Sequence, residues 1–192
     1  MTLREMLAAG RFPAYTQHEI DDTATFCHNH AVRMVPLENG DYQLTDGNDG
    51  SYGLFKQDVF VGYANVVPET FGSTSYGSLK LIYLVPEARK TKAFLIFVNA
   101  LRHIVGKPIV VDGAVFDDGA AALNAMAKRN LFTVKILDKL TNCVAPFLGI
   151  VPTEHSKAII VEGIDFPLGD YYPLPGMSPT DPSCYRSFLW FG

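Results

Sequence analysis

The spacing of apolar and polar residues predicts two helices at the start of the chain. Thr2 and Glu5 have the spacing of a capping box and Gly10 follows them, which predicts a short first helix. Thr16 and Glu19 repeat this spacing ahead of further apolar positions, and they predict a second helix that ends at about residue 30. In both cases the paired side chains can satisfy backbone N–H groups that the first helical turn leaves unpaired.

Residues 31–86 have the pattern of β-strands. Their apolar runs are interrupted by three dipeptides typical of hairpin turns, which are Asn39-Gly40, Asp46-Gly47 and Asp49-Gly50. The last strand of this stretch is predicted at residues 79–85 and ends at Pro86, which cannot donate a ladder hydrogen bond. We therefore expect a series of strands connected by hairpins.

The second half of the chain alternates between helices and strands. Residues 91–105 are apolar on nearly every side and predict a buried helix, and residues 108–112 predict a short strand inside the sheet. The Asp117-Asp118 pair caps a further helix. Two more strands are predicted at residues 131–137 and 157–163. This order predicts an α/β protein with an α+β mixed sheet flanked by helices, in which the strand at 108–112 returns beside the strand at 79–85.

Residues 166–192 form a C-terminal tail that differs from residues 1–165, which we assign to one domain. Prolines exclude a helix or a central strand over this length. The tail is rich in aromatic residues: Tyr171, Tyr172, Tyr185, Phe188, Trp190 and Phe191. We expect it to form an ordered contact surface, against its own domain or against another chain, because exposed aromatic side chains make a sticky patch. The second alternative is favoured, and the residues expected to bind a protein partner or a second copy are Tyr185, Phe188, Trp190 and Phe191.

Composition and charge restrict the classes of function. With 48% hydrophobic and 19% charged residues, the chain has the composition of a folded globular protein. Its formal net charge of −4 gives no global electrostatic reason to bind nucleic acid or an anionic membrane. The three cysteines are too widely spaced to indicate a disulfide framework, and no apolar run is long enough to cross a bilayer. We therefore predict a soluble, cytoplasmic protein without nucleic-acid or membrane partners.

Two segments that contain cysteine suggest metal binding or nucleophilic catalysis. Cys27, His28 and His30 lie close together, but this short run directs at most two ligands toward one ion, whereas zinc needs three or four. We interpret the run as the polar end of the second helix with an ordinary buried cysteine, and we expect no metal site. Cys143 has His155 downstream without the signature of a catalytic pair, so we predict a buried structural cysteine there.

The most informative cluster is a basic turn between the predicted strand at 79–85 and the predicted helix at 91–105. Arg89, Lys90 and Lys92 stand where helices normally favour acidic residues, because the helix dipole places partial positive charge at the N-terminus. An anion held by free backbone N–H groups explains three cations at this position. A solvated basic loop without a ligand is the alternative.

The motif YLVPEAR at residues 83–89, together with the order of elements over residues 15–165, resembles the GNAT acyltransferase superfamily. In that family a strand ending in V-x-P-E-x-R leads into a glycine-rich loop whose backbone N–H groups hold the CoA pyrophosphate. The resemblance implies that the backbone of Leu84 and Val85 borders the pantetheine arm of acetyl-CoA. It also implies that the phosphates meet Arg89, Lys90, Thr91 and Lys92. Glu69 and Glu87 lie near the relevant strand ends and are the candidates for a catalytic base.

Departures from the family pattern weigh against an enzyme. Lys92 and Phe94 occupy the two positions where the family uses small residues, since a Cβ there crowds the pyrophosphate. Ala127 stands where the family commonly has the tyrosine that protonates the leaving thiolate. We therefore favour a non-catalytic GNAT-like protein that acts through protein–protein contacts and needs no cofactor. The alternative is a CoA-dependent N-acyltransferase that transfers an acetyl group to an amine.

Some bacteriophage proteins, including virion-associated ones, look like degenerate members of this superfamily. By that resemblance, the non-catalytic hypothesis includes a phage assembly protein or a protein located in the virion.

Overall fold

The computed structural model describes residues 16–37, 40–89, 91–111, 117–128, 132–152 and 154–162. Within them the helices are α2 (Gln17–His30), α3 (Ala93–Val105) and α4 (Asp117–Lys128), and a short 3-10 turn occupies Pro86–Ala88. The predicted first helix near residues 2–10 and the tail at 166–192 lie outside the described residues. None of the described helices is long and apolar enough to cross a membrane.

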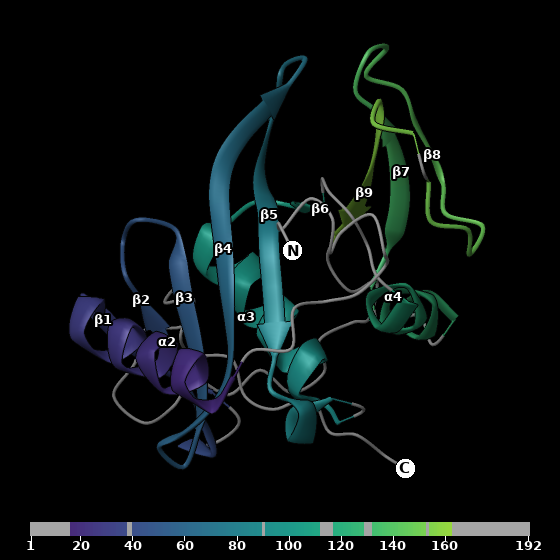
Figure 1. Ribbon diagram of the computed structural model, residues 1–192. Coiled ribbons are helices and arrows are strands. Elements are labelled where there is room, and N and C mark those ends of the chain that lie inside the picture. The colour runs from purple at the N-terminus through teal and green to yellow at the C-terminus, as the bar shows by residue number, and fades with distance from the viewer. Residues whose placement is uncertain are drawn as a thin grey trace.

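The strands of the described residues form one mixed sheet in the order β1-β2-β3-β4-β5-β6-β9-β7-β8 (Figure 1). Their bounds are β1 (Arg33–Leu37), β2 (Tyr42–Asp46), β3 (Ser51–Lys56), β4 (Val59–Phe71), β5 (Thr74–Leu84), β6 (Ile109–Val111), β7 (Val134–Asp138), β8 (Val144–Pro146) and β9 (Lys157–Val161). β5 and β6 pair in parallel, whereas every other neighbouring pair is antiparallel. The prediction of an α/β protein with a mixed sheet is confirmed.

The hairpins of the first half turn at residues whose φ angle is positive. Gly40 and Gly50, at two of the predicted turns, have φ angles of +94° and +87°. Glycine adopts this region readily because it has no Cβ. The turn between β3 and β4 instead places Gln57 and Asp58 at +47° and +64°. The sequence pattern does not predict this turn, because Gln-Asp is not one of the dipeptides typical of hairpins. It also does not predict the short strand β8.

Helix α3 forms the centre of the core, as the apolar pattern of residues 91–105 predicts. Phe97 and Leu101 are fully buried, and each such side chain contributes roughly 1.5–3 kcal/mol to stability. The helix ends at Gly106, which has a φ angle of +65° and donates its N–H to the Arg102 carbonyl at 3.0 Å. β6 then returns beside β5, and Ile109 lies opposite Gly77 in a parallel pair. The prediction of this strand–helix–strand unit is confirmed.

Helix α2 packs on the opposite face of the sheet from α3 (Figure 1). A Cβ added to Gly53 would lie 2.7 Å from the Cβ of Cys27 on α2, so this glycine permits the close approach of the helix. The neighbouring Leu54 belongs to the core cluster around α3, since successive strand residues point to opposite faces. The predicted helix that ends at residue 30 is confirmed, including its capping box at Thr16 and Glu19.

Strand β5 has a free edge along its C-terminal half. Leu81 lies opposite Asn65 and Leu79 lies opposite Val66, so Lys80 is an extra residue that bulges out of the ladder with β4. β6 pairs with residues 77–79 of β5, and among the described residues no strand pairs with the same edge beyond Leu79. The end of β5 therefore carries backbone groups that are available to a side chain or a ligand.

Candidate functional site at the end of strand β5

The basic turn folds back onto the end of β5. Arg89 donates a hydrogen bond from Nε to the carbonyl oxygen of Leu84 at 3.1 Å. Its guanidinium lies over the ring of Tyr83, 5.7 Å from the ring centroid. Burial raises the pKa of Tyr83, so the ring stays neutral beneath the cation. Arg89 thus already has a carbonyl and an aromatic partner within its own chain.

The backbone of Leu84 faces the free edge of β5. The N–H of Val85 donates to the carbonyl of Val61 on β4 at 3.0 Å. Because alternate residues of a strand direct their backbone groups to alternate edges, the N–H and C=O of Leu84 point away from β4. The carbonyl is the one that Arg89 occupies. Of the two residues predicted to border pantetheine, Val85 is therefore paired within the sheet, and Leu84 faces outward.

The start of α3 is organised by Thr91. Its Oγ1 donates to the carbonyl of Ala88 at 2.6 Å and accepts the N–H of Ala93 at 3.2 Å. Lys92 is the N-cap residue of α3 and supplies no capping side chain. Phe94 is half-buried and packs against the core cluster. Lys90 lies outside the described residues. The structure thus brings Arg89, Thr91 and Lys92 together at the helix start, where Arg89 and Thr91 make hydrogen bonds to nearby carbonyls.

The two candidate bases do not share a site. Glu69 lies opposite Tyr76 on β5, whereas Glu87 is exposed in the turn that follows Leu84. The eight steps along β5 from Tyr76 to Leu84 span about 26 Å at roughly 3.3 Å per residue. Glu69 forms an ion pair with Lys80 at 2.8 Å, and this hydrogen bond lowers the pKa of its carboxyl group. A carboxylate held in this way is a weak proton acceptor.

A pocket of about 360 Å³ lies next to the basic turn, between α2 and the sheet. Its lining is mostly aromatic and aliphatic and consists of Ile20, Asp22, Thr23, Phe26, Phe60, Tyr63, Leu81 and Tyr83. Tyr83 connects this pocket to the turn, because the Arg89 guanidinium lies over the same ring. The sequence pattern does not predict the pocket. Its residues come from three elements that only the packing of α2 brings together.

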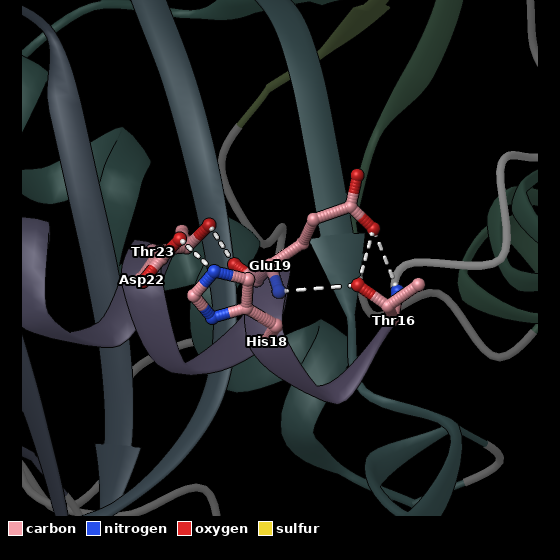
Figure 2. Close-up of polar contacts among 5 residues, drawn as sticks. All are labelled: Thr16, His18, Glu19, Asp22 and Thr23. Carbon is pink, nitrogen blue, oxygen red and sulfur yellow. Dashed lines mark hydrogen bonds and ion pairs between the residues drawn. The ribbon is translucent and has the colours of Figure 1, made fainter.

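The first turns of α2, which carry Ile20, Asp22 and Thr23 of the pocket lining, are ordered by local polar contacts (Figure 2). Thr16 Oγ1 accepts the N–H of Glu19 at 3.3 Å, and the N–H of Thr16 donates to the Glu19 carboxylate at 2.7 Å. The latter hydrogen bond lowers the pKa of Glu19. Thr23 donates to the Glu19 carbonyl at 2.7 Å, and His18 lies 3.5 Å from the Asp22 carboxylate. The capping box therefore fixes the helix end from which Asp22 and Thr23 reach the pocket.

Packing contacts fix the positions of the side chains of Cys27, His28 and His30. Cys27 is buried as predicted, and burial raises the pKa of its thiol to about 11. His28 packs against the ring of Phe55, with centroids 4.5 Å apart. His30 stacks on Phe26 at 4.2 Å, and its Nδ1 lies 3.0 Å from the Phe26 carbonyl oxygen. Across the described part of the chain, no group of three histidine, cysteine or acidic residues could hold a metal ion.

Cys143 is exposed, so the prediction that it is a buried structural cysteine is wrong. The residue follows the turn after β7, and the next residues form β8, a sheet edge whose three residues are all exposed. The prediction rests on the absence of a catalytic signature around Cys143, which carries no information about exposure. Its exposure follows from its place at the last strand of the sheet.

The sequence matches no protein-family model and no curated protein.

Proposed function

We propose that this protein is a non-catalytic GNAT-like protein that acts through protein–protein contacts. One observation carries the proposal: Arg89 and Thr91, in the turn that would hold a CoA pyrophosphate, make hydrogen bonds within the chain. Arg89 bonds the Leu84 carbonyl and covers Tyr83, and Thr91 bonds the Ala88 carbonyl. Phe94, at a position where the family uses a small residue, contributes to the core instead.

The strand order supports the GNAT-like part of the proposal. The resemblance implies a strand, a buried helix and a second strand in succession around the basic turn, followed by a further helix. The chain has this succession in β5, α3, β6 and α4, with β5 and β6 side by side and parallel. The order of elements therefore agrees with the resemblance over its central part.

Exposed apolar residues support the contact part of the proposal. Four large aliphatic side chains between β7 and residue 150 are exposed and offer apolar area to a partner. They are Leu140, Val144, Leu148 and Ile150. The aromatic tail at 166–192 adds Tyr185, Phe188, Trp190 and Phe191, residue types that are enriched in the cores of interfaces. A phage assembly or virion-associated role is the form of this function that the family resemblance suggests.

Calorimetric titration with acetyl-CoA tests the absence of cofactor binding. We expect no measurable heat of binding at micromolar acetyl-CoA with the full chain. An Arg89→Ala variant should behave in the same way, as should the control Arg33→Ala, whose arginine pairs with Asp46 at the other end of the sheet. A micromolar dissociation constant that is lost in Arg89→Ala and kept in Arg33→Ala would overturn the proposal.

Assembly tests the contact function directly. Trp190→Ala/Phe191→Ala in the full chain should abolish association with a partner or a second copy, while the melting temperature stays nearly unchanged. Light scattering coupled to size-exclusion chromatography measures the assembly, and differential scanning calorimetry measures the melting temperature. A full loss of stability without any change in assembly would contradict an anchoring role for these residues.

An acyl-CoA-dependent N-acyltransferase is the second candidate, and the free edge of β5 favours it. The bulge at Lys80 and the short pairing with β6 leave the outward backbone groups of Leu84 next to the basic turn. An extended pantetheine arm carries amides that can pair with such a strand edge, as an added strand would. Release of free CoA from acetyl-CoA in the presence of primary amines, followed with a thiol reagent, distinguishes this enzyme from the contact protein.

A further inference from the structure

Aromatic rings and one carboxylate line the pocket between α2 and the sheet. Besides two aliphatic side chains and a threonine, the lining consists of Phe26, Phe60, Tyr63, Tyr83 and Asp22. The volume of about 360 Å³ lies in the range of sites that hold small molecules. Asp22 is the one charged residue among these lining residues, so the pocket presents aromatic faces and negative charge.

The two phenylalanine rings of the pocket are held by neighbouring rings. His30 stacks on Phe26 with centroids 4.2 Å apart, and Phe55 meets Phe60 edge to face at 5.5 Å. Phe26 is still 36% exposed, so a molecule that enters the pocket can reach its ring. These rings are therefore ordered before any ligand binds.

The two tyrosine rings project from the same face of the sheet. Tyr63 and Tyr83 lie opposite each other in the ladder of β4 and β5. The Tyr63 hydroxyl lies 3.2 Å from Ser51 Oγ, and the Arg89 guanidinium lies 5.7 Å from the centroid of the Tyr83 ring. One ring of the pocket thus already contacts a cation of the chain itself.

The wall that α2 provides is acidic. Its first turns carry Glu19, Asp21 and Asp22, and the helix contains no lysine or arginine. The side chain of Asp22 is 67% exposed and lies 3.5 Å from His18 (Figure 2), so its carboxylate remains accessible to a further cation. Arg89 supplies positive charge at one ring, and the three carboxylates of α2 outweigh it in number. The charges around the pocket therefore favour a cation over an anion.

Two hydroxyl groups of the lining already have hydrogen-bond partners. Thr23 donates to the Glu19 carbonyl at 2.7 Å, and the Tyr63 hydroxyl pairs with Ser51. A primary ammonium group needs acceptors for three N–H donors when it leaves water, whereas a fully alkylated ammonium has no N–H to satisfy. The pocket therefore suits a cation that binds through aromatic faces and charge.

We propose that this pocket binds a fully alkylated ammonium group, carried by a small free molecule such as choline. The negative face of an aromatic ring attracts a cation within about 6 Å of its centroid, and Asp22 adds an opposite charge on the exposed side of the pocket. Such a group has no N–H to acylate, so this ligand differs from the acceptor amine of an acyltransferase. The proposal does not rest on the proposed function, because it involves neither CoA nor a protein partner.

Three matched ligands test the proposal in an NMR titration of the ¹⁵N-labelled full chain. Choline should bind about tenfold more tightly than its neutral isostere 3,3-dimethylbutan-1-ol, because only the cation is attracted by the rings. Ethanolamine keeps the charge but presents N–H donors, and it should bind about tenfold more weakly than choline. Equal binding of the alcohol or of ethanolamine would overturn the proposal, as would a titration in which choline causes no shifts. Tighter binding of blocked Nε-trimethyllysine than of choline would overturn the assignment to a free molecule and make a modified protein side chain the ligand.

Variants of the full chain locate the binding site. Asp22→Asn should weaken choline binding about threefold and leave the neutral alcohol unchanged, whereas the neighbouring control Asp21→Asn should match the parent. Phe26→Leu keeps an apolar side chain but removes a ring, and it should weaken choline binding about threefold. Its control is Phe71→Leu, whose ring contacts Tyr76 outside the pocket. The amide spectrum of each variant shows that it is folded. Choline binding that both Asp22→Asn and Phe26→Leu leave unchanged would place the ligand elsewhere and overturn the proposal.

Discussion

Replacing Gly53 by alanine should push α2 away from the sheet. The added Cβ would lie 2.7 Å from both the Cys27 Cβ and the Thr45 Oγ1, and 2.9 Å from the Cys27 Sγ. Carbon atoms in contact normally lie about 3.5–4.0 Å apart, so the helix must move by about 1 Å. Overpacking of this kind costs about 1–3 kcal/mol. For a chain of this size, each kcal/mol lowers the melting temperature by about 2–4 °C.

The reactivity of Cys27 measures the displacement of α2 separately from overall stability. Burial raises the pKa of this thiol to about 11, so about one molecule in a thousand is a thiolate at pH 8. An unburied thiol with a pKa of about 8.5 is about one quarter thiolate at that pH, so exposure can raise the rate roughly 200-fold. In a Cys143→Ser/Cys184→Ser background, Gly53→Ala should move the rate toward this limit.

Gly40→Ala is the matched control for Gly53→Ala. A Cβ at Gly40 meets nothing within 4 Å, but its φ angle of +94° strains any other residue. This variant should lower stability without changing the rate at which Cys27 reacts in native conditions. The packing argument fails if both variants speed the reaction equally, or if Gly53→Ala leaves both the melting temperature and the rate unchanged.

Three further predictions concern titration, an ion pair and a turn. Burial lowers the pKa of His103 to about 4. Between pH 6.5 and 4 the folded state therefore binds fewer protons than the unfolded state, and the free energy of unfolding should fall as the pH drops through this window. The expected fall is about 1–2 kcal/mol, after allowance for solvent screening. Urea unfolding should show that His103→Gln loses this dependence and that His155→Gln keeps it. Lys80→Ala should raise the pKa of Glu69 in a carbon NMR titration, since it removes the ion pair at 2.8 Å, and should change stability by less than about 1 kcal/mol. Asp58→Gly should raise the melting temperature by about 1–3 °C, because Asp58 has a φ angle of +64° that glycine adopts without strain.

The sequence predicts those helices and strands that nearby residues specify without contacts from distant parts of the chain. The capping box at Thr16 and the apolar run of residues 91–105 each specify a helix without reference to the rest of the chain. The parallel return of β6 beside β5 follows from the short connections on both sides of α3. In contrast, the turn at Gln57 and Asp58 forms because the strands on each side pair, against the preference of its own residues.

The candidate site is less predictable for a related reason. The basic turn is visible as a local cluster, but the partners of Arg89 are not, since Leu84 and Tyr83 come near it only when the chain folds back at Pro86–Ala88. The pocket depends on how α2 is seated, which Gly53 controls from a distant strand. Cys143 shows the same limit, because its exposure depends on its place beside the last strand of the sheet, which nearby residues do not reveal.

Arg89 bears on both functions, because its present contacts hold the guanidinium at the end of β5. A hydrogen bond that involves a charged group contributes about 1.5–3 kcal/mol, and Arg89 makes one to the Leu84 carbonyl. A phosphate that takes the Nε–H from this carbonyl binds about 10- to 100-fold more weakly than one held by other N–H groups of the guanidinium, since every 1.4 kcal/mol is a factor of ten. Contact with the Tyr83 ring adds to this loss. In the family that the chain resembles, backbone N–H groups of a glycine-rich loop hold the CoA pyrophosphate, and no existing hydrogen bond has to be broken. In this chain the side chain of Phe94 packs against the core, and Arg89 is hydrogen-bonded to the Leu84 carbonyl at the end of β5. We therefore expect this turn to bind CoA more weakly than a glycine-rich loop does.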